Sequence, residues 1–231
     1  LLVWVGSEQQ SGTGVEPTSV TFAGQSLTKA VTAISGTTIF DNVSLWYLVA
    51  PNTGTGTITA TYPSAIDFPM GIASSVYGAK QAAPEVTNSS VNNAGMTSTS
   101  ITTLTAGSWV VDGIVSGEDA VDLAPVSPQF AGPILTGNST SMGISGLVVA
   151  SSSTATTWRW QTTVNRTAHV VAAIAPATTT LATGTDPLSS TIAPGAAATL
   201  ADAFTFQTNS GTDTVTAVSV NLGTSVSAGL S

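Results

Sequence analysis

The feature that most restricts how this chain can fold is a succession of about ten short apolar or alternating segments, separated by turn-forming residues. The clearest of them, Val43–Ala50, is apolar at nearly every position and predicts a strand buried on both faces. Thr57–Tyr62 alternates apolar residues with threonine, which predicts a half-buried strand. Between the two segments, Pro51, Gly54 and Gly56 favour a turn. We expect these two strands to lie beside one another at the centre of the fold.

The other segments before residue 176 have the same character, and no amphipathic helical pattern lies between them. Residues 19–30 and 100–115 each predict a hairpin with a glycine in its turn. The polar residues 86–100 predict a loop or a weak edge strand, and residues 117–137, with their acidic residues and prolines, predict a long surface excursion. Short strands at regular spacing are typical of antiparallel sandwiches and barrels. The sequence therefore predicts an all-β fold, with an antiparallel jelly-roll β-sandwich over residues 1–176.

The character of the chain changes after residue 176. Residues 177–195 are rich in Thr, Ala, Pro and Gly without a clear apolar face, which predicts a linker or an extended leading strand. Thr199–Gln207 and Thr214–Leu222 alternate strongly and predict strands. So few strands cannot bury a core of their own. We expect residues 196–231 to be completed by further chain, by the first domain or by another molecule.

Charged residues are scarce in this sequence. They make up 7% of the chain, against about 25% in ordinary soluble domains. The hydrophobic content of 42% is sufficient for a packed core, so the polar surface must consist mainly of Ser, Thr, Asn, Gln and Gly. Such a surface is more typical of secreted, wall-attached or polymerised proteins than of cytosolic ones, and we expect an extracellular location.

The composition also argues against several kinds of function. The formal net charge is −8 with only four Lys and Arg residues, which disfavours nucleic acid as a partner. The absence of cysteine excludes disulfides, thiolate metal sites and cysteine nucleophiles. No apolar run approaches the ~20 residues of a membrane-spanning helix, so no membrane span is predicted. The opening residues show no signal-peptide pattern, and we expect the chain to be a mature or trimmed part of a longer protein.

The single histidine, His169, is the first candidate for catalysis. It lies in an alternating segment with Val171 and Ala173 on its face. A serine hydrolase needs its histidine within hydrogen-bond reach of a serine and an acid, and no GxSxG elbow is present. We therefore interpret His169 as a structural residue and predict no catalytic residues and no enzymatic activity.

The strongest polar constellation is a group of acidic residues at Asp112, Glu118, Asp119 and Asp122. Loop carboxylates suit Ca²⁺, which takes about six to eight oxygen ligands, although the spacing of an EF-hand is absent. A glycosidase pair at positions 118 and 119 is disfavoured, because adjacent residues of a strand point to opposite faces. We keep two interpretations, a solvated acidic loop or a calcium site, and predict no other cofactor.

Two tryptophans, Trp158 and Trp160, are separated by one residue, so on a strand both indoles point to the same face. Paired indoles can form a platform on which a sugar ring stacks. They can equally belong to the core of the sandwich, where aromatic side chains contribute much buried area. Both interpretations, sugar-binding residues and core residues, stay open from the sequence.

Three stretches resemble a lectin-like, concanavalin-type jelly-roll module of secreted and surface proteins of bacteria, found also in some phage proteins. They are VTFAGQSLTKA (Val20–Ala30), SLWYLVAPNTGTGTITATY (Ser44–Tyr62) and RTAHVVAAIAPA (Arg166–Ala177). The resemblance covers Leu1 to Ala177 and implies a fold and an extracellular setting but no active site, since its motifs are structural. His169 departs from the small or aromatic residue usual at its position, so no family role is transferred to it. Residues 199–231 look like the opening strands of an immunoglobulin-like module.

These observations predict a non-catalytic structural module of an extracellular surface protein, as the subunit of a fibre or filament. We expect it to associate with copies of itself, or with neighbouring domains of the same polypeptide, through β-strand edges. The alternative is a carbohydrate-binding adhesin domain, assisted by calcium, with a glycan as partner. A glycoside hydrolase or lyase would need a cleft with paired carboxylates, which the sequence does not show.

Overall fold

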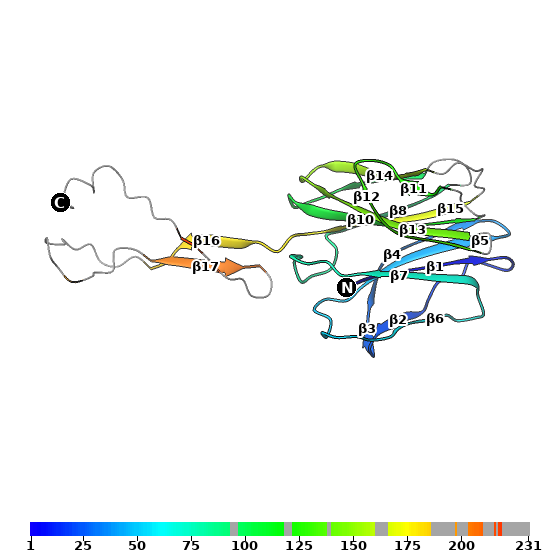
Figure 1. Cartoon of the computed structure of the whole chain (residues 1–231), viewed down its shortest axis with the longest axis horizontal. Coiled ribbons are helices and arrows are strands. Elements are labelled where there is room, and N and C mark those ends of the chain that lie inside the picture. The colour runs from blue at the N-terminus through cyan, green and yellow to red at the C-terminus, as the bar shows by residue number, and fades with distance from the viewer. Residues whose placement is uncertain are drawn as a thin grey trace. The chain divides into compact units, whose positions relative to one another are not determined.

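The computed structural model describes residues 1–92, 97–117, 122–137, 140–159, 166–185 and 203–209, together with residues 197, 215, 217 and 218. Throughout these residues the regular elements are β-strands, and the predicted antiparallel all-β sandwich is confirmed (Figure 1). None of the described segments forms a helix long and apolar enough to cross a membrane. The chain divides into two compact units, Leu1–Pro176 and Ala177–Ser231, at the residue where the sequence changes character.

The first unit contains two larger sheets that pack face to face. Sheet II has the strand order β4 (Thr28–Gly36), β5 (Phe40–Tyr47), β1 (Leu2–Gln9) and β7 (Asp67–Ser74). Sheet III has the order β12 (Phe130–Gly137), β13 (Thr140–Val149), β10 (Ser108–Gly117), β15 (Thr167–Ile174) and β8 (Val86–Asn92). The main hydrophobic cluster lies between them and contains Leu2, Trp4, Ala33, Val43, Leu45, Ile72, Val111, Val115, Met142, Ile144, Ala168, Val170, Ala172 and Ile174.

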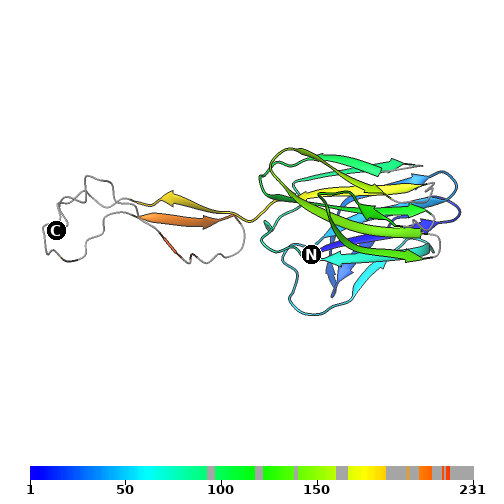
Figure 2. The same ribbon diagram turned by 45° about the horizontal axis from the view of Figure 1, so that its top comes forward.

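Two smaller sheets cover the outer faces of this sandwich, so the first unit has four layers. Sheet I, with the order β3 (Gln25–Ser26), β2 (Ser19–Phe22) and β6 (Ile58–Thr61), packs on sheet II through a cluster around Val3, Val5, Val20 and Trp46. Sheet IV, with the order β11 (Ala124–Pro125), β14 (Ser153–Arg159) and β9 (Thr97–Thr102), packs on sheet III. The labels of Figure 1 show the layers of this unit from β14 down to β2, and Figure 2 shows them from a turned view.

The central strand predicted at Val43–Ala50 is observed as β5 and is buried on both faces, as predicted. Val43 and Leu45 face sheet III, and Trp46 faces sheet I. The strand runs from Phe40 to Tyr47, so it begins and ends three residues earlier than predicted, because β1 and β4 both pair with residues 40–42. The Asn42 side-chain amide donates to the Ala33 carbonyl at 3.4 Å, and the Ser44 hydroxyl donates to the Val5 carbonyl at 3.3 Å.

The prediction that Thr57–Tyr62 lies beside this strand is wrong. β6 pairs with β2 in sheet I, whereas both edges of β5 are occupied by β1 and β4. With no free edge on β5, residues 51–56 carry the chain to another layer rather than forming a hairpin turn. The predicted faces of β6 are correct, since Ala60 and Tyr62 pack against the cluster between sheets I and II.

Four other expectations from the sequence can be compared with the structure. The turn predicted within residues 19–30 is present, with positive φ at Ala23 (47°) and Gly24 (80°), as in the two-residue turns of hairpins. The hairpin predicted for 100–115 is absent, because β9 and β10 belong to different sheets. Residues 117–137 are not only a surface excursion: their second half forms β12, because apolar residues replace the acidic ones there. The weak edge strand predicted within 86–100 is β8, at one edge of sheet III.

The second unit contains one described hairpin, formed by β16 (Thr179–Thr183) and β17 (Phe204–Thr208). The first part of the predicted linker 177–195 is thus a strand, the second of the two interpretations given above. β17 confirms a strand within Thr199–Gln207, although it starts later and ends one residue further on. Most of Thr214–Leu222 lies outside the described residues, and the immunoglobulin-like identity of residues 196–231 stays a prediction.

The close approach of sheets II and III at Gly6 yields a test of this packing. A Cβ at Gly6 would lie 2.5 Å from Val115 Cγ2 and 3.1 Å from Met142 Sδ. We expect Gly6→Ala to lower the free energy of unfolding by roughly 1–3 kcal/mol through overpacking, measured by urea denaturation. Adding Val115→Ala should recover part of that loss, so the two changes should be non-additive. Gly137→Ala, where a Cβ meets nothing within 4 Å, is the control. Strict additivity of the two substitutions would contradict the described contact.

Candidate functional site

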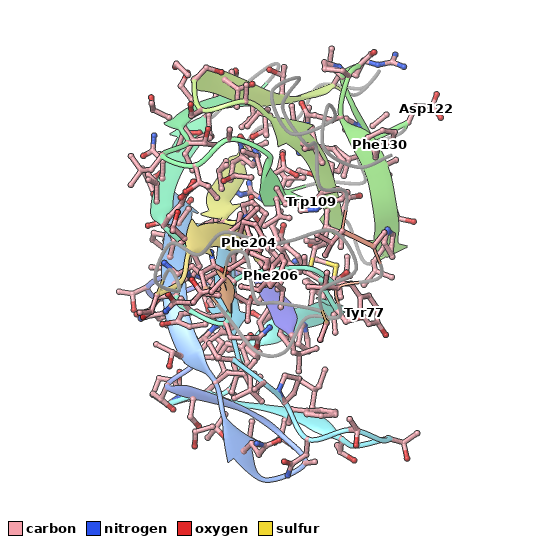
Figure 3. The ribbon with its side chains drawn as sticks, turned by 90° about the vertical axis from the view of Figure 1, so that its left-hand side faces the viewer. Tyr77, Trp109, Asp122, Phe130, Phe204 and Phe206 are labelled. Carbon is pink, nitrogen blue, oxygen red and sulfur yellow. The ribbon has the colours of Figure 1, made fainter. Side chains whose placement is uncertain are left out.

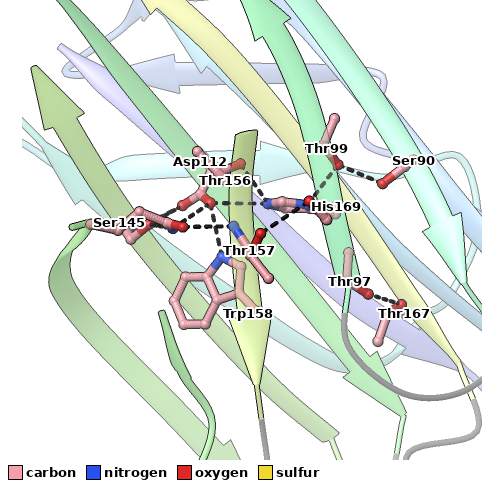
Figure 4. A network of polar contacts seen from close by, with 12 residues as sticks. Ser90, Thr97, Thr99, Asp112, Ser145, Thr156, Thr157, Trp158, Thr167 and His169 are labelled. Atoms are coloured by element: carbon pink, nitrogen blue, oxygen red, sulfur yellow. Dashed lines mark hydrogen bonds and ion pairs between the residues drawn. The ribbon is translucent and has the colours of Figure 1, made fainter. Parts of the chain in front are cut away.

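A network of buried polar side chains lies between sheets III and IV and is centred on Asp112 (Figure 4). Three neighbouring strands of sheet III supply its core: β10 carries Asp112, β13 carries Ser145 and β15 carries His169. Asp112 is directly opposite Ser145 in one pairing and opposite Val171, two residues from His169, in the other. Because alternate residues of a strand share a face, all three side chains point toward sheet IV.

Both oxygens of the Asp112 carboxylate accept hydrogen bonds. Oδ1 accepts from the Ser145 backbone N–H at 2.9 Å and from the Ser145 hydroxyl at 2.6 Å. Oδ2 accepts from Trp158 Nε1 at 2.9 Å and lies 3.0 Å from His169 Nε2. Gln129 Nε2 adds contacts to Asp112 Oδ2 at 3.3 Å and to the Ser145 hydroxyl at 2.7 Å. The carboxylate is therefore fully buried and fully hydrogen-bonded.

His169 connects this carboxylate to the hydroxyl groups of sheet IV. Its Nδ1 lies 2.7 Å from Thr99 Oγ1, and its Nε2 lies between Asp112 and the Thr156 hydroxyl, which is 3.4 Å away. Thr99 Oγ1 in turn contacts the Ser90 hydroxyl of β8. A neutral imidazole with its proton on Nε2 satisfies both main contacts, donating to Asp112 and accepting from Thr99.

Two opposing effects act on the pKa of Asp112. Burial by itself raises it, because the charged form loses its hydration. The contacts with His169, Ser145 and Trp158 favour the carboxylate, and their sum holds the pKa below its ordinary value of 3.8. Asp112 is thus a carboxylate that the surrounding donors keep ionised inside the fold.

The order Thr99–His169–Asp112 is the hydroxyl–imidazole–carboxylate order of a catalytic triad. In this structure all three side chains are buried, and neither Thr99 nor His169 lines any of the clefts described for the chain. A substrate carbonyl therefore has no space beside the Thr99 hydroxyl in this conformation. The arrangement joins sheet III to sheet IV through hydrogen bonds. The hydroxyls of Thr97 in sheet IV and Thr167 in sheet III, which are 2.6 Å apart, add a further contact.

The acidic residues predicted from the sequence do not all share one environment. Asp112 lies in the middle of β10 and faces the buried network, because that strand continues to Gly117. Asp122 is exposed and has a positive φ of 58° (Figure 3). Glu118 and Asp119 lie outside the described residues. Within the described part of the chain, no group of three or more His, Asp and Glu side chains suits a metal ion. A calcium site at Glu118, Asp119 and Asp122 stays a prediction, whereas Asp112 belongs to the core.

Trp158 is also a core residue in this structure. Its side chain is fully buried, its Nε1 donates to Asp112, and its ring packs over Gly143, where a Cβ would lie 2.7 Å from Cη2. An indole without exposed surface offers no face to a sugar in this conformation. Trp160 lies outside the described residues. Strand periodicity placed Trp158 on one face of β14 but did not show that this face is the one covered by sheet III.

A second buried cluster was not singled out by the sequence analysis. Glu8 of β1 and Asp41 of β5 are directly paired, and Arg166 lies against both. Arg166 Nη2 is 2.9 Å from Glu8 Oε2, and its Nε is 3.5 Å from Asp41 Oδ2. Gly117 leaves room for the guanidinium, since a Cβ there would clash with it. The sequence did contain a signal for this cluster. Lys and Arg residues are scarce, and Arg166, one of only four, directly precedes a segment that is apolar enough to be a buried strand.

This cluster changes the protonation behaviour of Asp41. Burial raises the pKa of Asp41 to about 7, Arg166 opposes the rise, and the neighbouring Glu8 adds to it. With two carboxylates and one guanidinium, ionising both acids leaves an uncompensated negative charge inside the sandwich. Asp41 therefore titrates near neutral pH, far from its ordinary value of 3.8.

Comparison with known proteins adds no relative: no protein family, no curated protein and no solved structure matches this chain. Its function has to be argued from the geometry described above.

We expect Asp112→Asn to lower the free energy of unfolding by roughly 3–5 kcal/mol, because it leaves buried donors facing an amide instead of a carboxylate. The pKa of Asp112 is lowered in the folded state, so its contribution to stability is present above pH 3.8 and is lost as the pH falls through the folded value. Denaturation curves between acid and neutral pH should thus converge for the two proteins at the acid end. Asp122→Asn, at an exposed position, is the control. Equal stability of Asp112→Asn and the parent at neutral pH would contradict this role.

For Asp41 the pH dependence has the opposite sign. Its folded pKa of about 7 lies above the unfolded value of 3.8, so its contribution is fully present below pH 3.8 and is lost as the pH rises to about 7. We expect the parent protein to lose stability between pH 4 and 8, by an amount on the order of a few kcal/mol. Asp41→Asn should flatten this slope, whereas Glu16→Gln, in a half-exposed ion pair, should not. Parallel curves for the parent and Asp41→Asn would refute the assignment.

Proposed function

We propose that this chain is a non-catalytic structural module of an extracellular surface protein and that its copies associate through β-strand edges. The observation that carries the proposal is the edge strand β12. Among the described strands it pairs only with β13, and several of its apolar side chains are exposed: Phe130 by 69%, and Ile134 and Leu135 by 37% each. An edge strand with exposed apolar side chains and free backbone groups is a template for pairing with another chain.

The two halves of β12 are not equally suited to pairing with a strand of a neighbouring chain. The pairing with β13 shifts register between Ala131 and Ile134, and Pro133, which lies there, has no N–H to donate. Such features usually protect an edge from other chains. Beyond them, residues 134–137 pair regularly with β13 and leave their outer backbone groups for a neighbour. We assign the contact between copies to this second half.

Two further observations agree with a structural role. The residues with catalytic potential, His169 and Asp112, are occupied in buried contacts between two sheets. The low charge content of 7% leaves a surface dominated by hydroxyl and amide groups, which is more typical of polymerised proteins than of freely diffusing ones. The carbohydrate-binding alternative rested on Trp158, Trp160 and the acidic loop as a calcium-assisted sugar site, and the burial of Trp158 removes one of the two indoles from the surface.

The assembly is tested by light scattering after size-exclusion chromatography over a wide range of protein concentration, together with negative-stain electron microscopy. We expect concentration-dependent oligomers that grow with ionic strength, because salt screens the repulsion between copies of net charge −8. Leu135→Lys should weaken association about tenfold or more, since a charge on the edge blocks pairing. Leu104→Lys, at an equally apolar residue exposed by 68% outside any strand, is the matched control. A protein that stays monomeric at all concentrations would overturn the proposal.

A further inference from the structure

The sandwich of sheets II and III is open on one side, where a cleft of about 410 Å³ reaches the hydrophobic layer between them. β7 is the last strand of sheet II and β12 is the last strand of sheet III, so none of the described strands covers this side. The cleft is lined by Trp4, Val111 and Ile144 of the main hydrophobic cluster and by Tyr77, Trp109 and Phe130. Its volume lies in the range of ordinary ligand pockets, about 300–1,000 Å³.

Exposed aromatic side chains gather at this cleft. Among the described residues, the two large apolar side chains with the greatest exposed fractions are Tyr77 (90%) and Phe130 (69%), and both border it. Trp109 is exposed by 38%, and in the view of Figure 3 it lies below Phe130 and above Tyr77. Large aromatic rings left in water around one concave surface mark a binding site far more often than a packing defect.

The floor of the cleft is formed by Trp4, which is exposed by only 1%. Its Nε1 is buried and lies against Gly113 of β10, where a Cβ would come within 2.8 Å of it. Gly113 does not line the cleft, so the floor offers a ligand an apolar ring and not the indole N–H.

The lining decides the chemistry of the ligand. None of the lining residues is charged, and the polar side-chain groups among them are the hydroxyls of Ser74, Ser75, Ser145 and Tyr77 and the indole N–H of Trp109. The Ser145 hydroxyl is already engaged with Asp112 and Gln129. A sugar bound here would lose the hydration of several hydroxyl groups and find few hydrogen-bonding groups in the lining to replace it, which is unfavourable. A carboxylate or ammonium group would be buried without a counter-charge, which is worse.

We propose that this cleft binds an uncharged, planar, mainly apolar small molecule, a fused aromatic ring system without an ionised group. The ring packs among Tyr77, Trp109 and Phe130 in offset or edge-to-face contacts. This site is separate from the edge contact assigned to residues 134–137 and does not depend on it.

The probe is Prodan, a neutral naphthyl ketone whose fluorescence reports the polarity of its surroundings. Titration into the full chain at a concentration where light scattering shows a monomer should give saturable binding with one site per chain. Trp109→Ala and Phe130→Ser should each weaken binding about tenfold or more, the loss of one good aromatic contact. Leu104→Ala removes an apolar side chain as exposed as Phe130 but outside the cleft, and should leave affinity unchanged within about twofold. Circular dichroism of each variant verifies its fold.

Competition against bound Prodan tests the predicted chemistry. Acetylnaphthalene, a neutral ketone, should displace the probe. Naphthoate, which is of similar size but anionic, should need a concentration at least about tenfold higher for the same displacement. Displacement by cellobiose or maltose at lower concentrations than acetylnaphthalene would overturn the proposal in favour of a sugar site.

Three other results would refute the site. The first is absence of saturable binding to the parent protein, and the second is unchanged affinity in both Trp109→Ala and Phe130→Ser. The third is binding that appears only when the protein oligomerises, which would place the site between copies. Leu135→Lys separates this proposal from the assembly: it should weaken association about tenfold or more and still bind Prodan as the parent does, since Leu135 does not line the cleft.

Discussion

The rest of the first unit depends on the way in which the Asp112 carboxylate is held. A buried charge costs several kcal/mol unless hydrogen bonds replace its hydration. Its donors come from Ser145, His169 and Trp158, and thus from three strands besides its own. Only one relative position of sheets III and IV satisfies all of them, so the network specifies a packing as well as stabilising it. Glu8, Asp41 and Arg166 form a comparable contact between sheet II and the start of β15.

A chain with so few charges therefore uses several of them inside the fold, and its surface is left to hydroxyl, amide and apolar groups. Sheets I and IV cover the outer faces of sheets II and III, and the two inner faces pack on each other. The sandwich is open on the side between β7 and β12. The exposed edge of β12 and the aromatic cleft both lie there. This is why both proposals concern that side of the sandwich, one for a neighbouring chain and one for a small molecule.

The strands of the first unit could be predicted from the sequence, because apolar alternation and turn residues are local signals. Burial of β5 on both faces followed from its apolar run, and the structural role of His169 followed from its apolar neighbours. Pairing partners could not be predicted, because they depend on which edges are already occupied. β6 failed to join β5 for this reason. The aromatic cleft was missed because Tyr77, Trp109 and Phe130 are distant in sequence and none of them stands in a recognisable motif.

The sequence by itself determined that the chain is all-β, that cysteine chemistry is absent and that the surface is nearly uncharged, since composition and periodicity do not depend on tertiary contacts. Only the tertiary structure decided which polar residues are buried. Asp112 appeared to belong to an acidic loop and Trp158 to a sugar platform or the core, and the structure joins them by a hydrogen bond of 2.9 Å. The physical reason is that strand periodicity assigns each side chain to a face, whereas the layer that covers that face is set by residues far away in the chain.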